Sequence, residues 1–69
     1  MKNRVRVFRA EFDFSQSDLA REAGLSRQTI SNIETGTKEP TLETAAKIAR
    51  VFKTAIEEVF PGIKEILKQ

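Results

Sequence analysis

Four polar side chains near the middle of the sequence could recognise hydrogen-bonding groups on a partner. They are Arg27, Gln28, Ser31 and Asn32. Arginine can donate two hydrogen bonds to O6 and N7 of guanine, and glutamine or asparagine can form a similar pair with adenine. These residue types therefore suit the reading of DNA bases, although composition alone favours an ordinary solvated helix face.

The side chains that most enzymes and metal sites use are missing. The sequence has no histidine and no cysteine, which excludes disulfides, thiolate metal sites and the usual pairs of nucleophile and base. Its three glycines form no phosphate-cradling loop, and the helical pattern gathers no carboxylates in a pocket. We therefore expect no enzyme activity, no metal, no cofactor and no small-molecule substrate.

Length and composition predict one small globular domain. The chain has 69 residues, of which 39% are hydrophobic and 32% charged. It contains no apolar run long enough for a signal peptide or a membrane span, so we expect a cytoplasmic protein. The net charge is only +2, but it is unevenly distributed. The basic residues Lys2, Arg4, Arg6 and Arg9 precede every acidic one, and the acidic pair Glu57 and Glu58 lies near the other end.

Apolar residues recur at helical spacing in five segments. The predicted helices cover residues 3–12, 16–24, 27–35, 42–52 and 55–60. Their apolar faces predict the core, with the fourth helix contributing a wide stripe that starts at Leu42. The main predicted core residues are Val5, Phe8, Leu19, Ile30, Ile33, Ile48 and Phe52.

Capping residues mark the helix ends. Serine and threonine, which are preferred N-caps, precede four of the five segments at Ser15, Ser26, Thr41 and Thr54. Ser15 with Asp18, and Thr54 with Glu57, have the spacing of a capping box. The second and third helices should end at Gly24 and Gly36, because glycine readily adopts the left-handed conformation of a C-cap.

The last residues form a short apolar tail. Ile63, Ile66 and Leu67 lie at helical spacing, but a helix this short is marginal in water unless it packs on something. We therefore divide the chain into a domain over residues 1–60 and a tail over residues 61–69.

Residues 16–36 have the pattern of a helix-turn-helix, in which two capped helices are joined by a short turn containing glycine. Ala20 and Ala23 are small enough to let the two helices approach closely. Apolar anchors hold the second helix down while its polar face stays outward. The anchors are Leu25, Ile30 and Ile33.

The segments SQSDLA at residues 15–20 and GLSRQTISNIE at residues 24–34, with Gly36 and Pro40, closely resemble the Cro and lambda-repressor type of helix-turn-helix. This is the xenobiotic-response-element family of bacterial, archaeal and phage regulators, and the resemblance covers residues 3–60. It implies an all-α, five-helix, lambda-repressor-like DNA-binding domain. The implied function is a sequence-specific transcriptional regulator, in particular a repressor, that reads the major groove of double-stranded DNA.

The resemblance also implies a role for individual residues. The base contacts would come from the third helix, through Arg27, Gln28, Ser31 and Asn32. The phosphate contacts would come from Gln16, Thr29 and Lys38. Arg9 and Glu34 match an arginine and a glutamate that pair in some members and tie the first helix to the third.

Two departures from the family pattern concern the surface. Asp13 stands where relatives often have glycine or asparagine, and it adds a negative charge close to the expected DNA side. Relatives usually have polar residues at the positions of Val7 and Phe12, so these two side chains could form an apolar patch for a partner.

A small module gains affinity by dimerising, because two recognition helices then read half-sites about 34 Å apart. We therefore expect a homodimer. Its predicted surface consists of Ile56, Val59, Phe60, Ile63, Ile66 and Leu67. The alternative is an antitoxin or a protein-interaction adaptor with the same fold, for which the apolar tail, Val7 and Phe12 are the hint.

Overall fold

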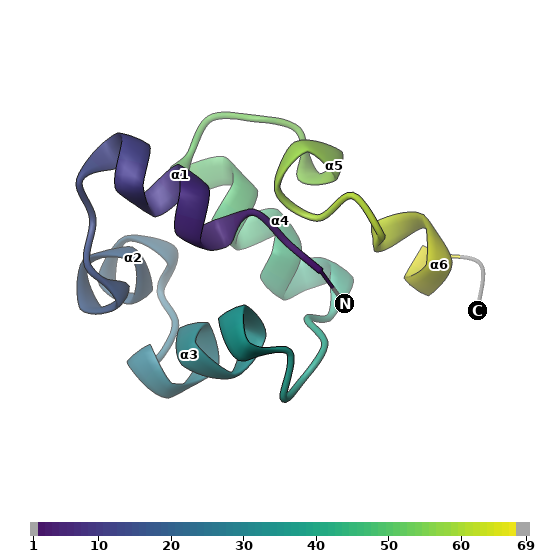
Figure 1. Ribbon diagram of the computed structural model, residues 1–69, viewed down its shortest axis with the longest axis horizontal. Helices are drawn as coiled ribbons and strands as arrows, with labels where there is room; N and C mark the ends of the chain where they lie inside the picture. Colours follow the sequence, from purple (N-terminus) through teal and green to yellow (C-terminus); the bar gives the residue numbers. More distant parts are fainter. Residues whose placement is uncertain (1, 68–69) are drawn as a thin grey trace.

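Six helices account for the regular structure of this chain in a computed structural model that describes residues 2–67, apart from the side chains of residues 66 and 67 (Figure 1). In chain order they are α1 (Val5–Phe12), α2 (Gln16–Ala23), α3 (Arg27–Thr35), α4 (Leu42–Val51), α5 (Ile56–Val59) and α6 (Ile63–Leu67). The predicted all-α class is confirmed. The structure differs from the predicted five-helix fold at the C-terminal end, where part of the predicted tail forms a sixth, short helix, α6.

Local hydrogen bonds define the first ends of α2, α3 and α4. The capping box predicted at Ser15 is present, since Ser15 Oγ accepts from Asp18 N and Asp18 Oδ2 accepts from Ser15 N, each at 2.9 Å. Ser26 and Thr41 likewise accept a hydrogen bond from the backbone N–H three residues later. These bonds satisfy N–H groups that a helix leaves without an internal partner.

Gly24 and Gly36 end α2 and α3 in the left-handed conformation, with φ of 69° and 78°. Asp13 and Lys53 adopt the same conformation, with φ of 58° and 56°, after α1 and α4. Glycine has no Cβ and aspartate tolerates this region comparatively well, whereas lysine has neither advantage. The turn at Lys53 is therefore the most strained of the four.

The capping box predicted for the fifth helix is wrong. α5 begins one residue later than expected, with Ala55 as its N-cap and no side-chain capping bond. Thr54 belongs instead to the end of α4, because its N–H donates to the carbonyl oxygen of Ala49 at 3.2 Å. A local hydrogen bond at the end of α4 thus decides the role of a residue whose sequence pattern also fitted a capping box.

The core is formed by apolar side chains from all six helices and from the residues that follow α4 and α5. Burial of such side chains is the main source of stability in a domain of this size. The fully or almost fully buried members are Val5, Leu19, Ala20, Ala23, Ile30, Ile33, Ala45, Ile48, Ala49, Phe52, Val59, Phe60 and Ile63. Leu42 is an exception to the predicted stripe of α4, since it is 45% exposed.

Three residues of the predicted dimer surface are buried within the single chain. Val59 and Phe60 are 0% exposed and Ile63 is 1% exposed, so all three lie in the core of this chain. Ile63, the first residue of the apolar stripe of the tail, packs on its own domain, and a domain boundary at residue 60 would cut through this packing. Ile56 is half-buried at the surface, and the side chains of Ile66 and Leu67 lie outside the described part of the structure.

Four phenylalanines pack together beside α1 and α4. The Phe52 ring lies 5.3 Å from the Phe8 ring and 5.1 Å from the Phe12 ring, between centroids, and Phe14 completes the group. Phe12 is 39% exposed and Val7 is 45% exposed. Phe12 is thus the outer side of an aromatic cluster rather than a separate patch, whereas Val7 is an exposed apolar residue of α1.

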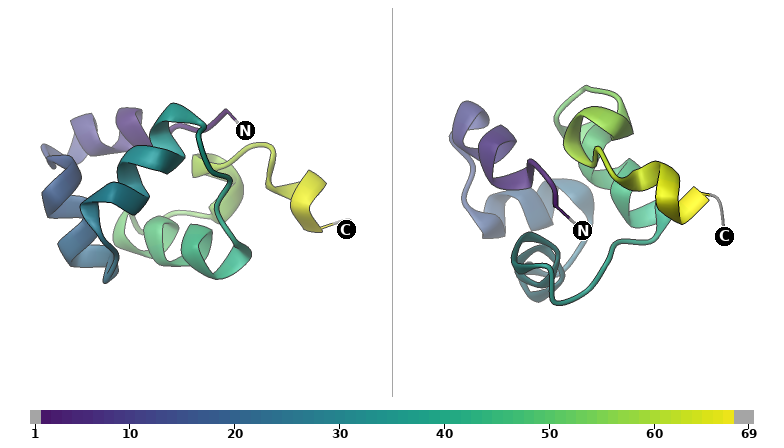
Figure 2. Two further views of the ribbon diagram at one scale, coloured as in Figure 1. Left: turned by 90° about the horizontal axis from the view of Figure 1, so that it is seen from below. Right: turned by 45° about the vertical axis from the view of Figure 1, so that its right-hand side comes forward.

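α2 and α3 lie next to each other at one side of the molecule, with α4 behind them and α5 and α6 toward the opposite end (Figure 1). Seen from below, α3 lies in front of the other helices (Figure 2, left). α6 is away from α3 in both figures. The described part of the C-terminal segment therefore leaves the outer edge of α3 uncovered.

Candidate nucleic-acid interface

The polar edge of α3 is held from behind by two buried isoleucines. Ile30 and Ile33 are 0% and 3% exposed, whereas Arg27 and Gln28 are exposed. Ser31 and Asn32 are half-buried. The four side chains predicted to contact bases thus occupy the helix surface that core packing leaves available, and a helix has the width of the DNA major groove.

Two of these side chains are hydrogen-bonded to each other. Gln28 Nε2 donates to Asn32 Oδ1 at 3.0 Å, across one turn of α3. Side chains four residues apart on a helix are neighbours, so the sequence spacing contained a signal for this contact that our reading of the sequence did not use. The bond links the orientation of one amide to that of the other.

Thr29 and Lys38 lie beside Asn32. All three line a cavity of about 140 Å³ between α3 and the first turn of α4. The Thr29 hydroxyl is 2.8 Å from the Ser26 hydroxyl, and the backbone N–H of exposed Lys38 donates to the carbonyl oxygen of Asn32 at 3.3 Å. Two of the three residues expected to contact phosphates, Thr29 and Lys38, thus lie on the same side of α3.

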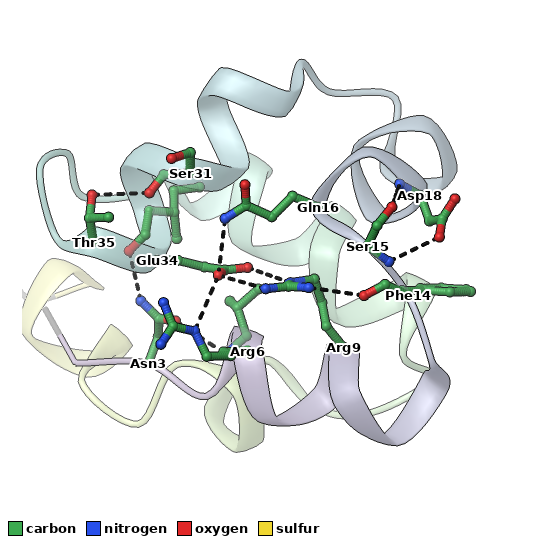
Figure 3. Close-up of polar contacts among 12 residues, drawn as sticks. Asn3, Arg6, Arg9, Phe14, Ser15, Gln16, Asp18, Ser31, Glu34 and Thr35 are labelled. Carbon is green, nitrogen blue, oxygen red and sulfur yellow. Dashed lines mark hydrogen bonds and ion pairs between the residues drawn. The ribbon is translucent and has the colours of Figure 1, made fainter.

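Gln16 is in a different place, at the first residue of α2, and it meets α3 at Glu34 (Figure 3). Gln16 Nε2 donates to Glu34 Oε1 at 3.2 Å. The pair expected between Arg9 and Glu34 is present with two bonds, 2.7 Å from Nε to Oε2 and 3.0 Å from Nη2 to Oε1. Arg9 Nη1 also donates to the carbonyl oxygen of Phe14 at 2.9 Å. One carboxylate therefore connects α1, α2 and α3.

Glu34 remains ionised although its side chain is only 1% exposed. Burial by itself would raise the pKa of Glu34, but the hydrogen bonds from Arg9 and Gln16, with the charges of Arg9 and Arg6, outweigh burial and lower it. The hydrogen bond to Glu34 in turn raises the pKa of Arg9. The pair is thus fully charged at neutral pH.

Asn3 is a structural residue that our reading of the sequence missed. Its Nδ2 donates to the carbonyl oxygen of Ile33 at 2.9 Å, and its Oδ1 accepts from Val5 N at 3.1 Å. It therefore satisfies the first backbone N–H of α1 and binds the end of α3. An asparagine shortly before an amphipathic segment is a signal for capping, but nothing local indicates the contact with α3.

The basic residues at the N-terminal end have unequal roles. Arg4 lies 5.4 Å from the centre of the Phe8 ring and 3.9 Å from Glu58, so it connects α1 to α5. Arg9 is bound to Glu34, as described above. Arg6 is 78% exposed and lies 3.8 Å from the same carboxylate. Of these three arginines, Arg6 is the one whose charge lies mostly in solvent.

Within residues 2–67, no group of histidine, cysteine, aspartate or glutamate side chains has an arrangement that could hold a metal ion. In the same part of the chain no helix combines the length and the apolar character that crossing a membrane requires.

Comparison with known proteins agrees with this architecture. The helix-turn-helix family model matches residues 5–59. An uncharacterized HTH-type transcriptional regulator from Methanocaldococcus jannaschii is 47% identical over 60 residues, which are 87% of this chain and 91% of the relative. The transcriptional repressor RstR of the cryptic phage CTXphi from Vibrio cholerae is 33% identical over 57 residues, 83% of this chain and 51% of the repressor.

Among solved structures, this fold is similar to the N-terminal DNA-binding domain of SinR from Bacillus subtilis. The TM-score is 0.74 with 27% identity, over 78% of this chain and 80% of the SinR domain. The match to the family model extends from α1 to the end of α5 and so includes every helix that positions the edge of α3. The chain therefore belongs to the Cro/C1-type helix-turn-helix family of transcriptional regulators.

Proposed function

We propose that this regulator binds double-stranded DNA sequence-specifically, with α3 in the major groove. The observation that carries the proposal is the uncovered polar edge of α3, anchored by the buried side chains of Ile30 and Ile33. In this arrangement the base contacts come from Arg27, Gln28, Ser31 and Asn32. Arginine then selects guanine and the two amides select adenine, because each pairs with the hydrogen-bonding groups that this base shows in the major groove.

Gln16, Thr29 and Lys38 supply the contacts to phosphates. They lie at two places along α3, Gln16 at Glu34, and Thr29 and Lys38 beside Asn32. Contacts of this kind fix the position of a recognition helix on the duplex without reading sequence. Three phosphate contacts around one short helix would fix the position of that helix along the duplex.

The protein acts as a repressor and as a homodimer in this proposal. One relative is named a transcriptional repressor. A domain of this size contacts few base pairs, and pairing two copies across half-sites about 34 Å apart supplies the missing affinity and selectivity. Of the side chains predicted for the dimer surface and described by the structure, Ile56 is the one at the surface. The chromosome of bacteria and archaea lies in the cytoplasm, which is where such a repressor works.

Selection of bound sequences from a random duplex pool tests the proposal. We expect a palindromic consensus whose half-sites are about one helical turn apart, as two symmetric copies require. Recovery of unselected sequences at every ionic strength would refute sequence-specific binding.

A salt titration distinguishes DNA binding from a function as antitoxin or adaptor. Binding driven by phosphate contacts weakens steeply as salt is added, whereas an apolar protein contact responds little. Of the apolar residues that favour the alternative, Ile63 is buried in the core, whereas Val7 and Phe12 are 45% and 39% exposed.

A further inference from the structure

We propose that Glu34 is a positioning residue for the phosphate contact of Gln16, so that the two side chains act as one unit when DNA binds. This inference rests on the DNA-binding function proposed above. Glu34 itself is 1% exposed and carries a negative charge, so it is unsuited to touching a phosphate directly. Its influence on binding has to pass through a neighbour.

The carboxylate of Glu34 accepts hydrogen bonds from Arg9 and Gln16 and forms an ion pair with Arg6 (Figure 3). Its Oε1 lies 3.0 Å from Arg9 Nη2, 3.2 Å from Gln16 Nε2 and 3.8 Å from Arg6 Nε. The two bonds from Arg9 hold the carboxylate in one orientation, because a guanidinium and a carboxylate are planar groups of matching geometry. Glu34, on α3, is thus a fixed acceptor beside Gln16, the first residue of α2.

A fixed acceptor determines which end of the Gln16 amide turns toward it. The amide has an oxygen, which only accepts, and an NH₂ group with two N–H donors. Ionised Glu34 accepts only, so the NH₂ group faces it and uses one N–H. The second N–H stays available for a phosphate oxygen. Without Glu34 the amide could rotate and present its oxygen, which a phosphate repels.

The charges around this unit also favour an anion. Arg6 and Arg9 together exceed the single charge of Glu34 by one positive charge. The repulsion that a buried carboxylate would exert on a nearby phosphate is therefore more than compensated, and Arg6, 78% exposed, can approach the backbone of the duplex. The unit orients a donor without making the surface negative.

A double-mutant cycle tests the proposal, with the full chain and a duplex of random sequence at low ionic strength. The variants are Gln16→Ala, Glu34→Ala and the double variant, and fluorescence anisotropy measures the dissociation constant. We expect each single substitution to weaken binding about tenfold, and Glu34→Ala to have less than about a twofold effect when Gln16 is already alanine. That loss of effect is what positioning through Gln16 requires.

Asn3→Ala is the matched control, because Asn3 also ties α1 to the end of α3 but does not contact Gln16. Its effect on binding should be the same with and without Gln16. Equal effects of Glu34→Ala in both backgrounds, or no effect of Gln16→Ala, would overturn the proposal while leaving DNA binding intact. If the wild-type chain binds no duplex at all, DNA binding and the positioning role are both refuted.

Glu34→Gln keeps the cycle informative if Glu34→Ala does not fold. The glutamine retains one oxygen that can accept from Gln16 but also offers an NH₂ group, so the orientation of Gln16 is only partly fixed. We expect the dissociation constant of Glu34→Gln to lie between those of the wild type and Gln16→Ala. This intermediate effect should again disappear in the Gln16→Ala background, and its persistence there would overturn the proposal.

Discussion

Gln28 and Asn32 are bonded to each other on the exposed edge of α3, with 3.0 Å between Gln28 Nε2 and Asn32 Oδ1. The bond leaves Gln28 Oε1 and Asn32 Nδ2 to face a partner and makes each amide part of the other's environment. Two side chains proposed to read neighbouring bases are therefore coupled before DNA arrives.

Gln28→Ala should relax sequence preference at two neighbouring base pairs. The base pair that Gln28 contacts loses about 1–3 kcal/mol of discrimination, and the one read by Asn32 loses a smaller amount because the Asn32 amide can now rotate. Selection from a random duplex pool with both proteins measures the change. Glu57→Gln, on distant α5, is the control and should leave the consensus as it is. An unchanged consensus for Gln28→Ala would exclude this residue as a base reader.

Lys38→Ala should weaken binding to all duplexes alike. A phosphate contact carries no sequence information, and its loss reduces the slope of log affinity against log salt concentration by about 1. Anisotropy titrations at several salt concentrations give both quantities. Lys64→Ala removes the same charge from α6 and should alter neither. If Lys38→Ala affects one consensus position only, Lys38 contacts a base and not a phosphate.

The pairing of Glu34 should stabilise the fold at neutral pH and lose this effect in acid. The pKa of Glu34 is lowered below its ordinary value of 4.5 in the folded chain. The stabilisation by ionised Glu34 is therefore complete above pH 4.5 and is lost as the pH falls through the lower pKa of the folded chain. Glu34→Gln should therefore lower the free energy of unfolding at pH 7 by about 1–3 kcal/mol, because Arg9 loses its charged acceptor.

Urea denaturation of the wild type and Glu34→Gln across pH measures this difference. The pKa of Asp18 is also lowered, by its hydrogen bonds with Ser15 and Arg21. That contribution is common to both proteins and cancels in the comparison. A stability difference that stays constant from neutral pH into acid would show that the charge of Glu34 does not matter.

Lys53→Gly should stabilise the protein. Lys53 has a φ of 56° after α4, and a left-handed conformation costs an ordinary L-residue roughly 1–2 kcal/mol. Glycine avoids this cost, although part of the gain is offset by its greater freedom in the unfolded chain, so we expect about 1 kcal/mol in urea denaturation. Asp13→Gly, with a φ of 58°, should give less because aspartate tolerates the region better. A loss of stability for Lys53→Gly would mean that the lysine side chain makes a compensating contact.

Ile63→Ala should destabilise the chain by about 2–5 kcal/mol, as expected for truncation of a buried side chain that leaves a cavity. Ile56→Ala should cost less, because Ile56 is half-buried. Urea denaturation distinguishes the two. If α6 were a separate dimerisation tail, Ile63→Ala would leave the unfolding of the monomer unchanged and lower only self-association, which sedimentation measures.

Residue spacing is sufficient to predict the features that arise within one or two helical turns. The caps at Ser15, Ser26 and Thr41 and the glycine ends of α2 and α3 form between residues a few positions apart, so their spacing is sufficient to predict them. The inward direction of Ile30 and Ile33 follows in the same way from the period of the helix. These local rules placed the polar edge of α3.

Which surface a later segment meets depends on the packing of the whole domain. Ile63 has the same local pattern whether it faces a second copy or its own core, and only packing against the rest of the domain buries it. Gln16 and Glu34 are far apart in sequence, so their bond exists only once α2 and α3 have packed. The physical reason is that local spacing fixes the direction of a side chain, while its partner depends on how the helices pack together.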